Sequence, residues 1–383
     1  MLYRMVRPLL FRMNPEWVHR QTLRLGRNLS RVSLVVGLIK QVYGTQYRTL
    51  KVNAFGLNFE NPVGLAAGFD KQGELSEIIP SLGFGHMEVG SISSRPWPGN
   101  PSPTLLRLPV DRGLINYLGL NSEGSEVVLT RLKKGRARIP TGINLVKTAD
   151  PEITGEAAIQ DYLDSVSKFY PLADYITLNL SCPNTIEGKS FEDPELLEPF
   201  LSRLQTARTE WESKSHPKAF LVKLSPDLED SRLDRLVGLS RDHGIDGFVI
   251  GNTTGRREAL RTDHGILEKF GPGGLSGRPL KKYIEQMIDK VYRQTQGQVP
   301  IIACGGVGCD PDEDPARQVW DYLRRGACLV QMYTGLIYRG PSLVKRINRG
   351  LVQILREEGI SDLSEFLRSR QPASSKVRTD MGA

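Results

Sequence analysis

Eight short apolar segments recur along the body of this chain, and stretches with helical periodicity separate them. They are Pro62–Ala67, His86–Val89, Gly142–Leu145, Tyr175–Leu180, Ala219–Lys223, Gly247–Ile250, Ile301–Ala303 and Leu329–Met332. Short apolar runs of this kind are typical of buried strands, and parallel strands need long crossover connections, usually helices. The pattern predicts an α/β fold, a (β/α)8 TIM barrel. A doubly wound open sheet is the alternative, although no GxGxxG follows the first strand.

The chain of 383 residues is long enough for one large domain with an appendage, or for two domains. We expect a helical segment over residues 1–45, a barrel domain over residues 46–371 whose strands follow a small hairpin at Leu50–Phe59, and a flexible tail over residues 372–383. The segment Arg95–Gln160, rich in proline and glycine, is expected to cover the mouth of the barrel.

The first forty residues are basic and amphipathic. They contain eight arginines and lysines against one acid, so most of the net charge of +8 lies there. Apolar residues recur among these bases at spacings near three and four, which predicts amphipathic helices. The longest uncharged apolar stretch, Val32–Ile39, is far shorter than the roughly 20 residues of a spanning helix. We expect this segment to lie on an anionic membrane surface. A helix packed on the body and a mitochondrial presequence are the alternatives.

The charge and cysteine patterns narrow the function. Because the rest of the chain is nearly neutral, the charge distribution argues against nucleic acid as a partner. The four cysteines, Cys182, Cys304, Cys309 and Cys328, form no CxxC pair and are too few for a disulfide scaffold. A reducing compartment and no metal site are the expectations, and no iron–sulfur spacing is present.

Nearly every predicted strand is followed by glycine or a polar residue, and barrel enzymes build their active sites at that end. These positions include Ala66–Lys71, Gly90-Ser91, Asn144, Asn179–Thr185, Lys223, Gly251–Thr254, Gly305-Gly306 and Tyr333–Gly335. Glycines after the last two strands match the phosphate pocket that barrels commonly carry, which predicts a phosphorylated cofactor. Glycine turns after strands also arise for purely steric reasons.

The segment Leu178–Thr185 places a cysteine between two asparagines at the end of a strand. Pro183 stops the strand, so Cys182, Asn179 and Asn184 are expected to lie together. A buried cysteine that acts as a small hydrophobe is the alternative. Asn116 and Asn252 add two more uncharged amides, a set that suits a polar planar ligand, and Lys71 could balance a carboxylate.

With these motifs together, the chain resembles the dihydroorotate dehydrogenases, and in particular their membrane-associated, quinone-dependent class 2 branch. The resemblance runs from residue 1 to about residue 350. Its specific segments are Asn61–Lys71, Gly113–Asn116, the Cys182 segment, Val222–Leu228, Gly273–Leu280 and Leu329–Gly335.

The resemblance implies FMN as the cofactor and dihydroorotate as the substrate, which is oxidised to orotate. It implies FMN contacts from Ala66, Ala67, Gly68, Phe69, Asp70, Ser91, Asn144, Asn179, Lys223, Gly251, Gly277, Gly306, Tyr333 and Thr334. It implies substrate contacts from Lys71, Asn116, Tyr117, Leu118, Gly119, Leu120, Asn179, Asn184, Asn252 and Thr253. Cys182 falls at the catalytic base, which takes a proton from C5 while C6 delivers hydride to the flavin. Lys223 would favour negative charge on the reduced flavin.

Several positions depart from the class 2 pattern. Class 2 members carry serine at the base position, whereas the cysteine and the following Gly188-Lys189 resemble class 1. Gly251 stands where the family usually has threonine, and Leu120 where class 2 usually has phenylalanine.

The resemblance implies an enzyme of pyrimidine synthesis that passes electrons to a membrane quinone, as a monomer or weak oligomer. It would lie on the cytoplasmic face of a bacterial membrane, with the mitochondrial inner membrane as the alternative. A related enzyme that uses fumarate or another dihydropyrimidine is a second hypothesis. A non-catalytic flavoprotein is a third, and the polar strand ends speak against it.

Overall fold

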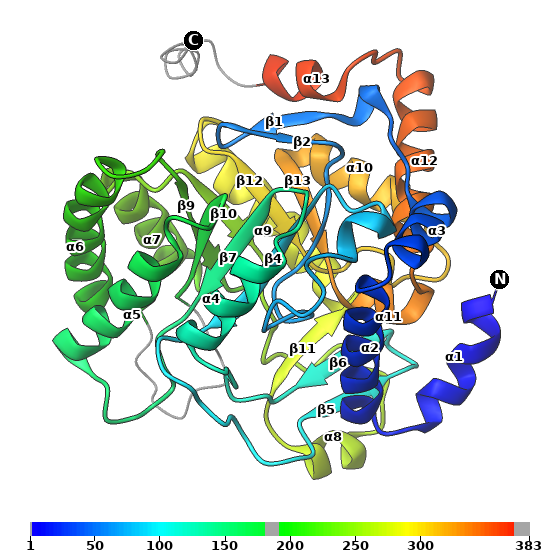
Figure 1. Ribbon diagram of the computed structural model, residues 1–383, viewed down its shortest axis with the longest axis horizontal. Coiled ribbons are helices and arrows are strands. Elements are labelled where there is room, and N and C mark those ends of the chain that lie inside the picture. The colour runs from blue at the N-terminus through cyan, green and yellow to red at the C-terminus, as the bar shows by residue number, and fades with distance from the viewer. Residues whose placement is uncertain (1, 181–190, 371–383) are drawn as a thin grey trace.

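The computed structural model describes residues 2–180 and 191–370, and its centre is a closed barrel of eight parallel strands (Figure 1). The strands are β3 (Val63–Leu65), β4 (His86–Ile92), β7 (Thr141–Leu145), β8 (Tyr175–Asn179), β9 (Ala219–Leu224), β10 (Gly247–Ile250), β12 (Ile301–Cys304) and β13 (Ala327–Met332). They follow one another around the barrel in chain order, and β13 closes the ring on β3 with Val330 beside Val63. The barrel prediction is confirmed, and the open-sheet alternative is excluded.

Helices surround the barrel because each presents one apolar stripe to it. The outer ring contains α4 (Ser125–Lys134), α5 (Gly155–Phe169), α6 (Pro194–Glu212), α7 (Asp230–Asp242), α9 (Lys281–Gln294), α10 (Pro315–Arg325) and α12 (Leu343–Glu357). In α10, Ala316, Val319, Trp320 and Leu323 are buried at spacings of three and four, so this face packs inward. Shorter helices are α8 (His264–Phe270), α11 (Thr334–Arg339) and α13 (Leu363–Ser369). Three 3-10 turns cover Arg48–Leu50, Ile79–Leu82 and Arg278–Leu280.

Two small antiparallel sheets lie at opposite ends of the barrel (Figure 1). The hairpin β1 (Val52–Ala54) and β2 (Leu57–Phe59) is the one predicted at Leu50–Phe59. The other sheet joins β5 (Leu105–Leu108), β6 (Gly113–Asn116) and β11 (Gly274–Gly277) in the order β11-β6-β5. Within the segment Arg95–Gln160, only the first part, which supplies β5 and β6, forms a structure outside the barrel. Its later part supplies α4 and β7, which belong to the barrel.

Three helices precede the barrel: α1 (Leu2–Arg12), α2 (Pro15–Ser30) and α3 (Ser33–Tyr43). They lie along one side of the barrel, in blue in Figure 1. Asn14 caps α2, because its Oδ1 accepts a hydrogen bond from the Trp17 amide at 2.9 Å and Pro15 occupies the first turn. Helix formation over the predicted segment 1–45 is therefore observed.

The inner face of these helices packs on the body. The Arg27 guanidinium lies 3.1 Å from the Glu74 carboxylate, and Arg107 Nη1 donates to the Met13 carbonyl at 2.9 Å. The outer face exposes apolar side chains among basic ones, with Met5 at 75% and Leu34 at 73% exposure. Within the described residues, we find no helix with the length and apolar character needed to traverse a bilayer. The predicted tail over residues 372–383 lies outside the described residues.

Candidate active site

A cavity opens at the carboxyl ends of the barrel strands, where the β11-β6-β5 sheet forms one of its walls. Sixteen of the predicted site residues line it: Ala66, Ala67, Gly68, Lys71, Ser91, Asn116, Leu118, Leu120, Asn179, Lys223, Asn252, Thr253, Gly277, Gly306, Tyr333 and Thr334. They come from seven barrel strands or the turns that follow them and from the added sheet. The chemistry-bearing residues thus converge on one space although they are scattered over the chain.

Other predicted residues lie around this cavity without lining it. Phe69 lines an adjoining apolar cavity. Asp70 is fully buried, and its carboxylate accepts hydrogen bonds from the amides of Glu74 and Leu75. Asn144 is also buried, while Tyr117, Gly119 and Gly251 are absent from the cavity wall. Cys182 and Asn184 lie outside the described residues.

Eight further residues of the cavity wall are not among the predicted contacts, although Gly305 and Gly335 lie in strand-end segments that the sequence indicated. They are Leu114, Ser276, Leu280, Cys304, Gly305, Val307, Met332 and Gly335. Most of them directly adjoin a predicted strand end, so a broader window at each strand end would have found them. Leu114 and Ser276 belong to β6 and β11, and no local pattern places those two strands over the mouth.

Hydrogen-bonded amides cross the floor of the cavity. Asn252 Nδ2 donates to Asn179 Oδ1 at 3.3 Å, and Asn179 Nδ2 donates to Ser91 Oγ at 2.9 Å. Ser91 Oγ donates to Asn144 Oδ1 at 2.5 Å, and Asn144 Nδ2 donates to Glu88 Oε2 at 3.1 Å. All donors point the same way, toward the Glu88 carboxylate. The side chains that face a ligand are therefore held in a defined orientation.

Lys223 brings a buried positive charge to the cavity. It ends the apolar run of β9, lines the cavity and is only 6% exposed. Within the described part of the chain, its ammonium forms no hydrogen bond or salt bridge, although its charge acts on the Cys304 thiol. A buried ammonium without an anionic partner is costly, so this position favours a ligand that carries negative charge.

Glycines form a close-fitting cradle in the same cavity. A Cβ at Gly306 would lie 2.9 Å from the Tyr322 hydroxyl, and one at Gly277 would lie 2.4 Å from the Arg112 carbonyl. Both residues have positive φ, at 79° and 99°, which favours glycine. Above them, the Ser276 and Thr334 hydroxyls share a hydrogen bond of 2.8 Å. Bare backbone and hydroxyls of this kind suit a phosphate group.

Gly251 has a conformational explanation for its departure from the family pattern. Its φ is 114°, and a Cβ there would lie 2.1 Å from the Cys304 carbonyl and 2.5 Å from Ile284 Cδ1. The backbone of this chain therefore excludes threonine at Gly251 unless the neighbouring turn moves.

A second, apolar cavity lies between the amino-terminal helices and the barrel. Leu10, Val18, Ile78 and Leu336 are among its wall residues, and it shares Leu114 and Tyr333 with the first cavity. An apolar molecule in the second cavity would therefore contact two residues that also contact the ligand of the first. Polar side chains interrupt its wall, among them Tyr3, His19 and Arg107.

Burial shifts the pKa of groups in and near the two cavities. It raises the pKa of the Tyr333 hydroxyl to about 12. Burial, helped by the nearby Lys71 charge, lowers the pKa of His19 to about 4. Burial raises the pKa of Asp70 to about 6, although its two backbone hydrogen bonds act in the opposite direction. Tyr333 and His19 are therefore both neutral at pH 7.

Comparisons with known proteins agree with this geometry. Residues 49–355 match the family model described as dihydroorotate dehydrogenase. A dihydroorotate dehydrogenase (quinone) of Roseiflexus sp. (strain RS-1) is 39% identical, over 95% of this chain and 97% of that protein. One from Thermobifida fusca (strain YX) is 37% identical over 99% of each. The crystal structure of DHODH from Eimeria tenella in complex with ferulenol superposes with a TM-score of 0.78. It is 32% identical and covers 95% of this chain and 99% of that one.

Proposed function

This chain belongs to the dihydroorotate dehydrogenase family and is a quinone-dependent enzyme of pyrimidine biosynthesis, and we propose that FMN and dihydroorotate bind in the polar cavity while a quinone binds in the apolar one. The observation that carries this proposal is the wall that the two cavities share at Leu114 and Tyr333. At this wall, a cofactor in the polar cavity would lie next to dihydroorotate on one side and next to the quinone on the other.

The residues present fit FMN. The glycine cradle at Gly277 and Gly306 and the hydroxyls of Ser276 and Thr334 would hold its phosphate. The Lys223 ammonium would lie beside the ring and stabilise negative charge there. Bound FMN would accept hydride from the substrate and later pass electrons to the quinone.

The substrate would lie against the amides at the other side of the polar cavity. Asn116, Asn179 and Asn252 line that cavity and offer both donors and acceptors to a cyclic imide. Lys71 would balance the substrate carboxylate. Its ammonium is held by Asn121, whose Oδ1 accepts a hydrogen bond from Lys71 Nζ at 2.7 Å. These contacts would fix the substrate ring in one orientation.

Cys182 would act as the catalytic base that removes the proton from C5 of dihydroorotate. Support comes from its position three residues after Asn179, which lines the cavity. Three residues of chain span at most about 10 Å, so a thiol at this position can reach a ligand in the cavity. A free cysteine, with a pKa of about 8.5, yields its thiolate far more readily than serine yields an alkoxide.

The apolar cavity favours quinone over fumarate as the electron acceptor. Its wall is mostly aliphatic and would leave a dicarboxylate poorly solvated. The exposed apolar face of α1 and α3 would hold the cavity mouth at a membrane, where quinones dissolve. We propose that the protein lies on the membrane surface as a peripheral protein.

Anaerobic spectroscopy tests this function. The purified holoenzyme should show the absorption of bound FMN, lose it on addition of dihydroorotate, and regain it when a soluble quinone is added. Replacing the quinone with fumarate should not restore the colour. A flavin that dihydroorotate leaves oxidised would contradict the assigned substrate, and recovery with fumarate alone would contradict the acceptor.

A further inference from the structure

A separate polar cavity lies between the start of α1 and the helices α11 and α12. Five arginines line it: Arg4, Arg7, Arg112, Arg339 and Arg346. The cavity volume of about 350 Å³ leaves room for a phosphate group with several waters. None of its lining residues belongs to the candidate active site.

Carboxylates do not neutralise this cluster of arginines. Within the described part of the chain, Arg346 alone among the five forms a salt bridge, from Nη2 to Asp314 Oδ1 at 3.6 Å. The neighbouring Asp310 is paired instead with Arg278, at 2.9 Å, and Arg278 is not part of the cavity wall. The cavity therefore carries a large excess of positive charge.

The guanidinium groups are held in place by contacts that leave their charge intact. Arg339 Nε donates to the Gly308 carbonyl at 2.8 Å, and Arg7 Nη1 donates to the Tyr338 carbonyl at 2.8 Å. The Arg112 guanidinium lies over the Tyr338 ring, 5.5 Å from its centroid. Backbone carbonyls and an aromatic face orient these groups before any ligand arrives, which lowers the entropic cost of binding an anion.

The arginines also act on one another. Burial lowers the pKa of Arg339, and the positive charges of Arg346, Arg4 and Arg112 lower it further. A guanidinium nevertheless stays protonated at neutral pH. Like charges gathered around one cavity repel, and an anion bound among them would relieve this repulsion through charge-assisted hydrogen bonds.

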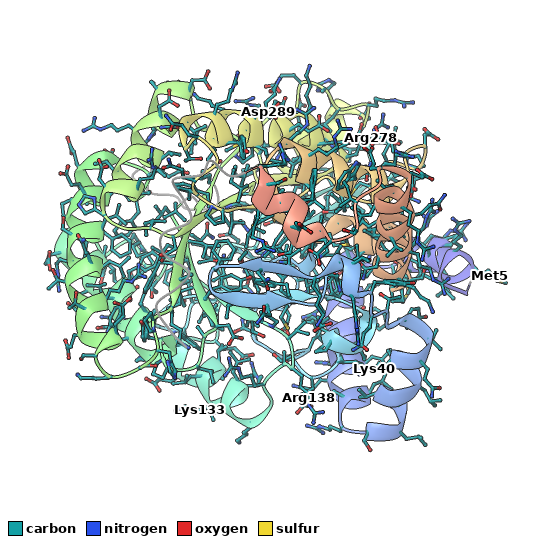
Figure 2. All side chains as sticks on the ribbon, turned by 90° about the horizontal axis from the view of Figure 1, so that it is seen from above. Met5, Lys40, Lys133, Arg138, Arg278 and Asp289 are labelled. Carbon is teal, nitrogen blue, oxygen red and sulfur yellow. The ribbon has the colours of Figure 1, made fainter. Side chains whose placement is uncertain are left out.

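Apolar groups lie on the same helix that supplies part of this cavity wall. Tyr3 lines both the arginine cavity and the apolar cavity. On the same helix, Met5 is 75% exposed and Leu9 61% exposed. Figure 2 shows Met5 at the outer edge of the molecule. A molecule that joins a phosphate to an acyl chain matches this combination, whereas a free phosphate would use only the arginines.

We propose that the arginine cavity is a binding site for the phosphate group of an anionic membrane phospholipid. The planar forks of Arg112 and Arg339 bind the phosphate oxygens, while the acyl chains stay in the membrane on which the exposed face of α1 is proposed to lie. This inference rests on the proposed membrane association. It assigns to the barrel itself, and not only to the amino-terminal helices, a part in recognising the lipid.

Vesicle binding by the full-length holoenzyme tests the site. The cavity variant Arg4→Gln/Arg112→Gln removes two charges and breaks no hydrogen bond or salt bridge between described side chains. The matched control Arg349→Gln/Arg356→Gln removes two charges from exposed positions of α12 that do not line the cavity. Affinity is measured by flotation with phosphatidylcholine vesicles, with and without phosphatidylglycerol.

The wild-type protein should prefer the phosphatidylglycerol vesicles. The cavity variant should lose about fivefold in affinity per arginine, while the control keeps nearly all of it. Equal losses in both variants would mean diffuse surface charge and would overturn the site. A cavity variant that binds like the wild type would do the same.

Inorganic phosphate distinguishes a soluble ligand from a lipid. If phosphate raises the melting temperature of the wild type but not of the cavity variant, while vesicle binding shows no lipid preference, the lipid assignment is overturned. Absence of any vesicle binding overturns both this inference and the proposed membrane association. Flavin bleaching by dihydroorotate, followed in the same preparations, reports separately on the proposed chemistry.

Discussion

Asn144 donates a hydrogen bond from its Nδ2 to the Glu88 carboxylate, at 3.1 Å, in the fully buried centre of the barrel. The same carboxylate accepts hydrogen bonds from Thr177 Oγ1 at 3.0 Å and Gln331 Nε2 at 2.8 Å. Because a carboxylate only accepts, the Asn144 amide must turn its oxygen toward Ser91. Glu88 thus orients amides that face the cavity although it does not line the cavity itself.

The first prediction follows from these donors and from the Tyr175 hydroxyl, which donates to Glu88 Oε1 at 3.4 Å. Glu88→Gln keeps the shape of the side chain but replaces one acceptor by a donor, so at least one of the donors loses its partner. Unfolding by denaturant should show a loss of about 1–3 kcal/mol in the free energy of unfolding. The exposed Glu258→Gln serves as the control. Stability and FMN content equal to the wild type would contradict the orienting role.

The second prediction concerns Lys223. Lys223→Gln removes the only positive charge that β9 brings to the cavity, and FMN should bind more weakly as a result. Bleaching of the remaining holoenzyme by dihydroorotate should slow by about 100-fold, since charge developing on the ring loses its partner. Stopped-flow absorbance measures the rate. Lys133→Gln, at an exposed position on α4 labelled in Figure 2, should leave it unchanged. An unaltered rate in Lys223→Gln would contradict the assignment.

The barrel could be predicted from the sequence because its strands are buried on both faces. Such strands appear as continuous apolar runs, as in Phe248–Ile250 or Ile301–Ala303, and helices separate them regularly. The β11-β6-β5 sheet could not be predicted. Gly274 pairs with Asn116, more than 150 residues away in the sequence, and no local pattern in either strand indicates which strand it pairs with.

The candidate site could be predicted to the extent that it lies at strand ends. Asn179, Lys223 and Asn252 follow apolar runs, and all three line the cavity. Asp70 also follows an apolar run, yet its carboxylate accepts hydrogen bonds from the backbone amides of Glu74 and Leu75 and does not line the cavity. Whether a polar strand end faces the ligand or stabilises the next turn depends on side-chain direction, which the sequence does not contain. The roles of these residues stay predictions.

The third prediction is a pH effect from His19. Its pKa is about 4 in the folded protein, against an ordinary value of 6.5, because the ring is buried beside Lys71. The unfolded chain therefore binds the proton more tightly. The stability contributed by the neutral ring is complete above pH 6.5 and is lost as the pH falls toward 4.

His19→Gln should remove this dependence. The difference in unfolding free energy between wild type and variant should change by about 3 kcal/mol between pH 7 and pH 4, in favour of the variant at low pH. Denaturant titrations at several pH values measure it. His264→Gln, at an exposed position, should follow the wild-type profile. A constant difference across this range would contradict the depressed pKa.

The fourth prediction tests the outer face of the amino-terminal helices. Leu34 on α3 is 73% exposed, so Leu34→Gln should leave the melting temperature unchanged. If this face enters a membrane, the substitution should weaken binding to lipid vesicles by about fivefold. Val127→Gln on α4, where the valine is 46% exposed, makes a similar change elsewhere and should have no effect. Equal binding by both variants would rule out insertion of this face.

The fifth prediction addresses the proposed base. Cys182→Ala should abolish bleaching of the flavin by dihydroorotate, because no group would remain at that position to take the C5 proton. Cys182→Ser should give a slower enzyme that needs a higher pH, since a serine hydroxyl loses its proton far less readily than a thiol. Cys328→Ser is the matched control. Its thiol lies outside the cavity wall and donates to the Ile301 carbonyl at 3.3 Å, a bond that serine can keep. Rates of bleaching across a pH series measure all three variants, and a wild-type rate in Cys182→Ala would show that another group removes the proton.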